Sequence, residues 1–212
     1  DTITNIDNIN NLTNKSRINI IKQFSNMCIS MIEGQYLDIN FETQQIISLN
    51  DYKNMIIKKT GALMTLAFQL PGILSGQNEQ SIKQLQKLGI IFGILFQISD
   101  DLLGIWGNPI KTGKSNYSDF KNNKKTYPIL LSMKKFEDKD KILFNNLLSN
   151  LNNESYLLII DILEKYKIKS TIQKECNSYL DQAIELITKS QLTKKSKTNI
   201  VELFKYVIER TK

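Results

Sequence analysis

Two adjacent aspartates follow the most apolar part of the chain. Asp100 and Asp101 come after the apolar run 90–96, with Gln97 shortly before them. On a helix, these three side chains would project to nearly the same side, because residues three and four positions apart are neighbours on the helix surface. Burying a carboxylate among apolar side chains is costly unless a cation or hydrogen bonds compensate. The pattern predicts a polar site on an apolar helix; alternatively, the two aspartates mark where that helix emerges into solvent.

The segment after the aspartates is rich in lysine. Its glycines, proline and polar residues make 104–125 a predicted loop, long enough to suggest a function. The charged residues of this loop are one acid, Asp119, and five lysines, Lys111, Lys114, Lys121, Lys124 and Lys125. Carboxylates beside lysines can simply form ion pairs. Carboxylates that bind Mg²⁺ opposite lysines also hold a diphosphate, since Mg²⁺ takes one or two carboxylates and completes its shell with phosphate oxygens and water.

Two smaller polar groups precede this region. Lys58, Lys59 and Thr60 interrupt an apolar stretch, and Gln35 and Asp38 stand three residues apart in the first expected helix. Taken alone, each group is typical of an exposed helix surface. In this order on one chain, together with the aspartates and the lysine loop, the two groups form a pattern that favours a functional site over separate surface pairs.

The composition excludes several kinds of site. The 212 residues include no histidine, which rules out His-based triads and HExxH zinc sites. Cys28 and Cys176 form no CxxC pair, which predicts two buried free thiols and no disulfide. Residues 113–115 resemble the end of a Walker phosphate-binding loop, but the spacing from Gly107 is one residue too long and no strand is expected before it.

The charge balance is positive. The chain has 28 Lys and Arg against 21 Asp and Glu, a net charge of +7, which suits nucleic acid, an anionic membrane surface or anionic small substrates. The lysines concentrate beside carboxylates without interleaved aromatic residues, which argues against nucleic acid. No uninterrupted apolar run is long enough to cross a bilayer and no secretory signal is visible, so we expect no transmembrane segment and a cytoplasmic protein.

The elements that must position these residues are expected to be helices. Prolines number only three and glycines nine, and apolar residues recur every three or four positions. Ser48 and Asp51 have the spacing of a capping box before an apolar run that reaches Pro71. The second half of 78–104 is apolar nearly all round, which predicts a central helix. The expected helices of this all-α single domain, residues 1–212, are 18–40, 48–73, 78–104, 126–136, 140–151, 154–165, 169–189 and 196–211.

Three stretches in this order resemble the trans-type isoprenyl diphosphate synthases, the polyprenyl synthetases that include farnesyl and geranylgeranyl diphosphate synthases. They are GQYLD at 34–38, KKTGAL at 58–63 and FQISDDLLGIWGNPIKTGKSNYSDFKNNKKTYP at 96–128. The last is long and ordered, and it resembles the second aspartate-rich motif of the family with its lysine loop. The likeness covers residues 20–131 and implies an isoprenoid (terpenoid) synthase-type helical bundle around a central apolar cavity.

The resemblance implies roles for single residues. Asp100 would be the main Mg²⁺ ligand, with Asp101 beside it as a metal ligand and Gln97 lining the diphosphate pocket. The residues that would contact the allylic diphosphate are Lys59, Thr60, Lys114 and Lys124, with Lys125 in place of Lys124 if the loop register differs by one. The residues that would hold lysines or metal-bound water are Gln35, Asp38 and Asp119.

The resemblance also implies a reaction and its partners. In the family, Mg²⁺ and lysines clamp an allylic diphosphate, its C–O bond ionises, and isopentenyl diphosphate attacks the resulting cation. This is a Mg²⁺-dependent head-to-tail condensation of isoprenoid biosynthesis. The implied substrates are the two diphosphates, and the implied assembly is a homodimer.

Two departures from the family pattern stand out. Gly104 occupies the position of the last aspartate of the second motif, and residues 1–33 contain only the isolated acids Asp1, Asp7 and Glu33 in place of a first aspartate-rich motif. The chain also begins with Asp rather than Met. We therefore interpret it as the C-terminal two-thirds of such an enzyme, with the N-terminal helices missing and no activity alone. The alternatives are a non-catalytic synthase-like subunit that binds diphosphates or pairs with a complete partner and, less favoured, a basic RNA- or membrane-associated helical protein.

Overall fold

The computed structural model describes residues 12–44, 46–107, 120 and 124–210, and in these residues helices account for all regular structure. The order is α1 (Asn14–Thr43), α2 (Leu49–Ile56), the π-helical turn η2 (Ile57–Gly61), α3 (Ala62–Leu74), α4 (Glu79–Trp106), α7 (Tyr127–Lys135), α8 (Asp138–Ser149), α9 (Asn153–Lys165), α10 (Ile168–Lys189) and α11 (Lys194–Glu209). The all-α prediction is confirmed, and the predicted boundaries are mostly within a few residues of those observed.

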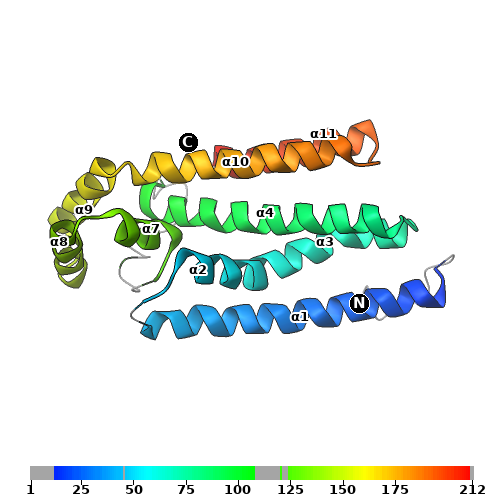
Figure 1. The fold of residues 1–212 in the computed structure, drawn as a ribbon, viewed down its shortest axis with the longest axis horizontal. Coiled ribbons are helices and arrows are strands. Elements are labelled where there is room, and N and C mark those ends of the chain that lie inside the picture. The colour runs from blue at the N-terminus through cyan, green and yellow to red at the C-terminus, as the bar shows by residue number, and fades with distance from the viewer. Residues whose placement is uncertain (1–11, 45, 108–119, 121–123, 211–212) are drawn as a thin grey trace.

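Helix α4 lies at the centre of the bundle. Figure 1 shows it between the α2 to α3 segment on one side and α10 on the other, with α1 outermost. Thirteen of its residues between Leu85 and Ile105 are buried, which confirms the predicted central helix. By length and composition α4 would also suffice to cross a membrane, but 61% of its apolar window is buried by the surrounding helices, as in the core helix of a soluble protein.

The α2 to α3 segment begins at the predicted cap. The Ser48 hydroxyl accepts a hydrogen bond from the Asp51 backbone N–H at 3.1 Å, and the Asp51 carboxylate accepts one from the Ser48 N–H at 3.1 Å. The helical segment then continues through η2 and past Pro71, which lies inside α3, to Leu74. The predicted segment 48–73 is therefore one helical rod with a π-turn in its middle.

Glycines bring three helical segments into backbone contact around η2. A Cβ at Gly34 of α1 would lie 2.2 Å from the Lys59 backbone nitrogen, and a Cβ at Gly93 of α4 would lie 2.5 Å from the Gly61 Cα. Such distances are shorter than any packed side chain permits. The glycines of the GQYLD and KKTGAL stretches thus lie where α1, η2 and α4 meet.

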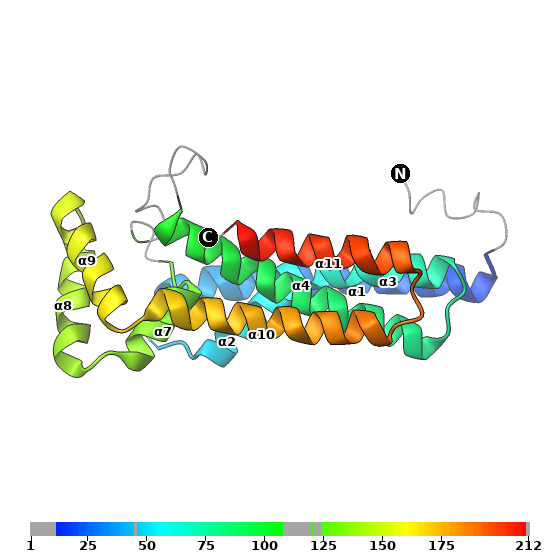
Figure 2. The ribbon, with the colours of Figure 1, turned by 90° about the horizontal axis from the view of Figure 1, so that it is seen from above.

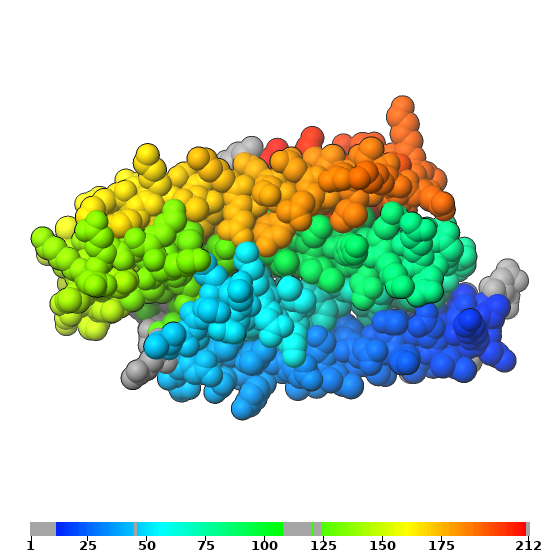
Figure 3. All heavy atoms as spheres, in the orientation of Figure 1, coloured from blue at the N-terminus to red at the C-terminus, as the bar shows by residue number. Residues whose placement is uncertain are grey.

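The remaining helices cover one side and one end of the bundle. In Figure 2, α10 and α11 run along α4, while α8 and α9 form a hairpin at the end where α7 begins. Figure 3 shows α1 and α10 as opposite edges of the face in view. Cys176 on α10 is buried and free, as predicted, but Cys28 on α1 is only partly buried, because α1 is covered on one side only.

Candidate functional site

A small polar pocket opens beside the end of α4. Its volume is about 80 Å³, and α1, α2, η2, α4 and the residues that precede α7 form its walls. The lining residues are Asp38, Phe41, Glu42, Tyr52, Met55, Lys59, Gln97, Asp100, Asp101, Lys124, Lys125 and Thr126. The structure thus gathers residues that are far apart in the sequence, and seven of the ten predicted site residues lie in or directly beside this pocket.

The two aspartates have opposite surroundings. Asp101 is only 5% exposed, so it does not mark the emergence of the helix into solvent. Asp100 is partly exposed and, within the described part of the chain, its carboxylate forms no hydrogen bond or ion pair. Of the two aspartates, Asp100 is therefore the one whose carboxylate is available to a ligand.

Donors from three helices hold the Asp101 carboxylate. Its Oδ2 accepts hydrogen bonds from the Tyr52 hydroxyl and, at 2.8 Å, from the Tyr127 backbone N–H, while Oδ1 accepts one from Gln97 Nε2 at 3.2 Å. The Tyr127 N–H is the first of α7, so Asp101 also satisfies an otherwise unpaired donor at that helix start. These bonds compensate for burying the charge.

The π-turn η2 presents Lys59 and Thr60 to the pocket. Lys59 Nζ forms an ion pair with Asp38 Oδ2 of α1 at 2.5 Å, and the Thr60 hydroxyl donates to Gln97 Oε1 at 3.1 Å. Gln97 in turn donates to Asp101, so the hydroxyl, amide and carboxylate form one chain. A π-turn re-aims side chains relative to a regular helix and is frequent at functional sites.

Other predicted residues lie at the margin or elsewhere. Lys124 and Lys125 both line the pocket, so the geometry leaves the choice between them open. Gln35 lies one turn before Asp38 with an exposed side chain, and it does not line this pocket. Lys114 and Asp119 lie outside the described residues.

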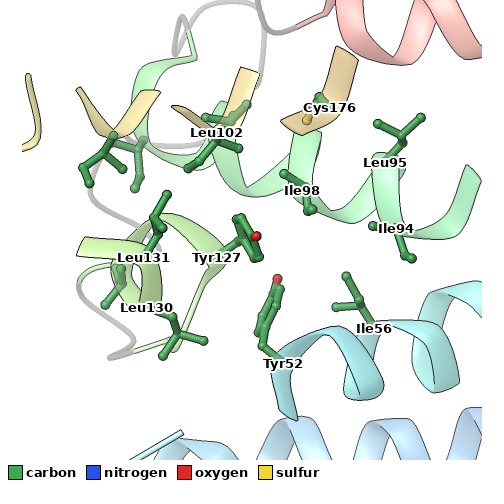
Figure 4. Close-up of a cluster of buried hydrophobic side chains, with 14 of the residues drawn as sticks. Tyr52, Ile56, Ile94, Leu95, Ile98, Leu102, Tyr127, Leu130, Leu131 and Cys176 are labelled. Carbon is green, nitrogen blue, oxygen red and sulfur yellow. The ribbon is translucent and has the colours of Figure 1, made fainter. Parts of the chain in front are cut away.

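A second group of contacts lies behind the pocket and is not predicted from the sequence. Lys53 of α2 forms an ion pair with Glu175 of α10 at 2.7 Å, and the Tyr127 hydroxyl donates to the other Glu175 oxygen at 2.6 Å. Figure 4 shows the Tyr52 and Tyr127 rings together between α2, α4 and α7; their centroids are 5.8 Å apart. The only sequence signal was a tyrosine at the start of each of two apolar helices.

The surroundings of this second group shift two pKa values. Burial alone would lower the pKa of Lys53, but hydrogen bonds to Glu175 and Tyr179 raise it well above the usual lysine value. Burial and the hydrogen bond to Glu175 raise the pKa of Tyr127. Lys53 therefore stays charged and the Tyr127 phenol stays protonated at neutral pH.

An additional cation lies next to the motif. The Arg210 guanidinium, just after α11, lies 4.9 Å from the centre of the Phe96 ring, and Phe96 directly precedes Gln97. Its Nε and Nη2 are buried and find no hydrogen-bond partner among the atoms that the structure describes. The sequence predicts only a C-terminal helix in this region.

The bundle also has an apolar cleft, distinct from the polar pocket. It measures about 440 Å³ and lies between α3, α4 and α11, where Phe68, Leu85 and Leu203 are among its walls. Phe68 packs against Phe92, and Phe92 stacks on Phe96. Aromatic rings thus fill the interior between this cleft and the end of α4 that carries Gln97.

Comparison with known proteins decides the family. Residues 3–165 match the profile of the polyprenyl synthetases. The chain belongs to the polyprenyl synthetase family. The geranylgeranyl diphosphate synthase of Saccharolobus solfataricus is 31% identical over 183 residues, which are 85% of this chain and 55% of that relative.

Solved structures agree with this assignment. The geranylgeranyl pyrophosphate synthetase of Pyrococcus horikoshii superposes with a TM-score of 0.85 and 26% identity over 93% of this polyprenyl synthetase chain and 60% of its own. A geranylgeranyl pyrophosphate synthase from Corynebacterium glutamicum, solved in complex with isoprenyl diphosphate and magnesium, shares the fold with a TM-score of 0.83 at 21% identity, over 94% of this chain and 57% of its own. The chain spans about half the length of such relatives.

Proposed function

We propose that this polyprenyl synthetase chain forms the part of a prenyltransferase that binds an allylic diphosphate and its Mg²⁺. The protein containing it would condense isopentenyl diphosphate head to tail with the allylic substrate. The observation that carries this proposal is the partly exposed Asp100 carboxylate, which has no partner among the described residues and shares one pocket with Lys59, Gln97 and the pair 124–125. A pocket that combines carboxylates with the cations Lys59, Lys124 and Lys125 and the Gln97 amide suits a metal-bound diphosphate better than a metal or an anion alone.

The pocket residues fit Mg²⁺ only when phosphate oxygens are also present. In the part of the chain that the structure describes, no three acidic or thiol side chains form a metal cluster. Asp100 supplies one hard oxygen ligand, and the resemblance adds Asp101 as a second; Mg²⁺ accepts such a small set when phosphate and water complete its shell. When bound, Mg²⁺ would neutralise negative charge that develops on the leaving diphosphate.

The protein's own cations and donors would do the rest. Lys59 would exchange its ion pair with Asp38 for the diphosphate, and Asp38 would keep the ammonium oriented in the free protein. Thr60 would exchange its hydrogen bond to Gln97 for a phosphate oxygen, and Gln97 would donate through the N–H that Asp101 does not use. Lys114 and Lys124 would be further cations, with Gln35 and Asp119 as their supports. Donors fixed before reaction stabilise developing charge without reorganisation, which lowers the barrier to C–O ionisation.

We further propose that the working protein is a cytoplasmic homodimer with one all-α domain over these residues. Helix α1 supports an additional packing partner, because it leaves Ile18, Ile32 and Ile39 more than half exposed. Apolar side chains in such a row are typical of a surface that another helix covers.

Prenyl transfer by the full-length gene product tests this function. We expect labelled isopentenyl diphosphate to enter a longer prenyl diphosphate, and Asp100→Asn to lower the rate by at least about a hundredfold, since it removes a charge from the leaving-group site. Asp161→Asn, at an exposed position of α9, should retain the wild-type rate. Equal rates in the two variants would reject the site.

Two observations favour a second function. The described residues contain no metal-binding cluster, and residues 1–33 contain no first aspartate-rich motif. A non-catalytic subunit that binds diphosphates or pairs with a complete synthase would need neither. Binding of Mg²⁺ and diphosphate by a full-length product that never transfers a prenyl group would support this alternative.

A further inference from the structure

We propose that Glu175 on α10 is a positioning residue for the diphosphate pocket, which it does not touch. This inference rests on the proposed function. It assigns a role to the part of the chain beyond residue 165, where the family match ends. Glu175 would act through Tyr127 on Asp101, and so on the aspartate pair and Gln97.

A closed circuit of contacts links Glu175 to the pocket. The two Glu175 oxygens bind Lys53 Nζ at 2.7 Å and the Tyr127 hydroxyl at 2.6 Å. The Tyr127 backbone N–H reaches the Asp101 carboxylate at 2.8 Å, and the Tyr52 hydroxyl reaches the same Asp101 oxygen. Because Tyr52 and Lys53 are neighbours on α2, the circuit closes through α2, α4, α7 and α10.

The circuit fixes Tyr127 at both of its ends. Its hydroxyl is held by Glu175 and its backbone N–H by Asp101, so a shift of the ring moves the donor that Asp101 needs. The Glu175 side chain is 28% exposed, but Tyr127 is only 2% exposed and Asp101 5%, so water cannot easily replace a hydrogen bond lost at Asp101. Loss of the Glu175 carboxylate would therefore weaken the hydrogen bond that the Tyr127 backbone N–H donates to Asp101.

Asp101 passes this constraint to the ligand-binding groups. The Asp101 Oδ1 atom accepts a hydrogen bond from Gln97 Nε2 at 3.2 Å, and Asp101 is the covalent neighbour of Asp100. Residues that orient metal ligands without touching the metal commonly change metal affinity or activity by about 10- to 100-fold when they are mutated. Glu175 does not contact the proposed metal ligands and acts on them only through Tyr127, so we expect a change in affinity at the lower end of that range.

The competing explanation is that Glu175 only attaches α10 to the bundle. In that case its loss would lower the free energy of unfolding and leave the affinity of the folded protein unchanged. The two explanations therefore differ in a binding constant measured on folded protein.

Titration calorimetry with Mg²⁺ and inorganic pyrophosphate separates them. Glu175→Gln keeps the side-chain shape, and Tyr127→Phe removes only the hydroxyl that Glu175 holds. We expect each to weaken pyrophosphate binding by about tenfold, at a temperature where circular dichroism shows every variant folded. We expect the double variant to bind pyrophosphate only slightly more weakly than either single variant, because both substitutions remove the same hydrogen bond between Glu175 and Tyr127.

Glu185→Gln is the matched control. Glu185 lies on the same helix in an exposed pair with Lys189 at 2.5 Å, away from the circuit, and its substitution should leave the affinity at the wild-type value. Wild-type affinity in Glu175→Gln and Tyr127→Phe, even with lower melting temperatures, would overturn the positioning role alone. Absence of Mg²⁺-dependent pyrophosphate binding by the wild-type chain would overturn the proposed function and this inference with it.

Discussion

At the residue scale, the surroundings of Asp100 and Asp101 decide what each can do. The spacing of Gln97, Asp100 and Asp101 was sufficient to predict that they share one side of a helix, and the structure confirms it. The sequence did not indicate which aspartate is buried. That depends on Tyr52 and Tyr127, which are 49 and 26 positions away from Asp101 and reach it only through tertiary packing.

Removal of the Tyr52 hydroxyl should be costly. Tyr52→Phe leaves the buried Asp101 carboxylate with one donor fewer, and an unsatisfied buried polar group costs about 1–3 kcal/mol. We expect urea unfolding to show a loss of that size. Tyr36→Phe, at a position of α1 that is 68% exposed, should change the free energy of unfolding very little. Equal losses in the two variants would contradict the account of Asp101.

Asp140 should give the protein a specific sensitivity to acid. Hydrogen bonds from Lys165 and Tyr166, both at 2.6 Å, lower the pKa of the Asp140 carboxyl below its ordinary value of 3.8. A carboxyl whose pKa is lowered in the folded state stabilises that state above its ordinary pKa, and the contribution is lost as the pH falls through the lowered value.

The Asp140 contribution can be measured by difference. Between neutral pH and about pH 3, the stability gap between wild type and Asp140→Asn should narrow in urea unfolding as Asp140 becomes protonated. A constant gap for Asp140→Asn would refute the assignment.

At the element scale, glycines and a π-turn set the geometry of the site. The periodicity of apolar residues was sufficient to predict the helices, and the spacing of Ser48 and Asp51 predicted where one begins. The π-turn η2 was not predicted, because Lys58 and Lys59 look like any exposed pair within a helical run. The close approach of Gly34 to the η2 backbone is equally invisible in a single sequence, since it depends on how two helices cross.

Gly34→Ala should therefore disrupt the crossing. The new methyl would meet the Lys59 backbone at 2.2 Å, and overpacking of this kind costs about 1–3 kcal/mol or more because backbone must move. Gly61→Ala is the control, since its methyl would meet its nearest neighbour, the Ile56 carbonyl oxygen, at an ordinary 3.5 Å. Denaturant unfolding should show the larger loss for Gly34→Ala, and the opposite order would contradict the packing described.

At the scale of the whole molecule, the order of the motifs along the chain agrees with the family assignment. The motifs in 34–38, 58–63 and 96–128 were sufficient to predict the family, because their order and length are specific. The circuit through Glu175 and the cation at Arg210 could not be predicted, since α10 and α11 carry no motif and reach the site only by folding back along α4.

The 212-residue chain alone should bind its ligands without catalysing prenyl transfer. It supplies one half of the proposed metal site, so we expect the purified 212-residue chain to bind Mg²⁺ and pyrophosphate and to form no longer prenyl diphosphate from farnesyl and isopentenyl diphosphates. A radiolabel assay checks this. Product formation by this chain alone would show that a first aspartate-rich motif is unnecessary.

The central claim is that Asp100 holds a metal-bound diphosphate in the pocket of η2 and α4. Calorimetric titration of the wild-type chain, Asp100→Asn and the control Asp161→Asn with pyrophosphate, each with and without Mg²⁺, tests it most directly. The account predicts binding that requires Mg²⁺ in wild type and Asp161→Asn, and an affinity at least about tenfold weaker in Asp100→Asn. Equal, Mg²⁺-independent binding by all three proteins would contradict it.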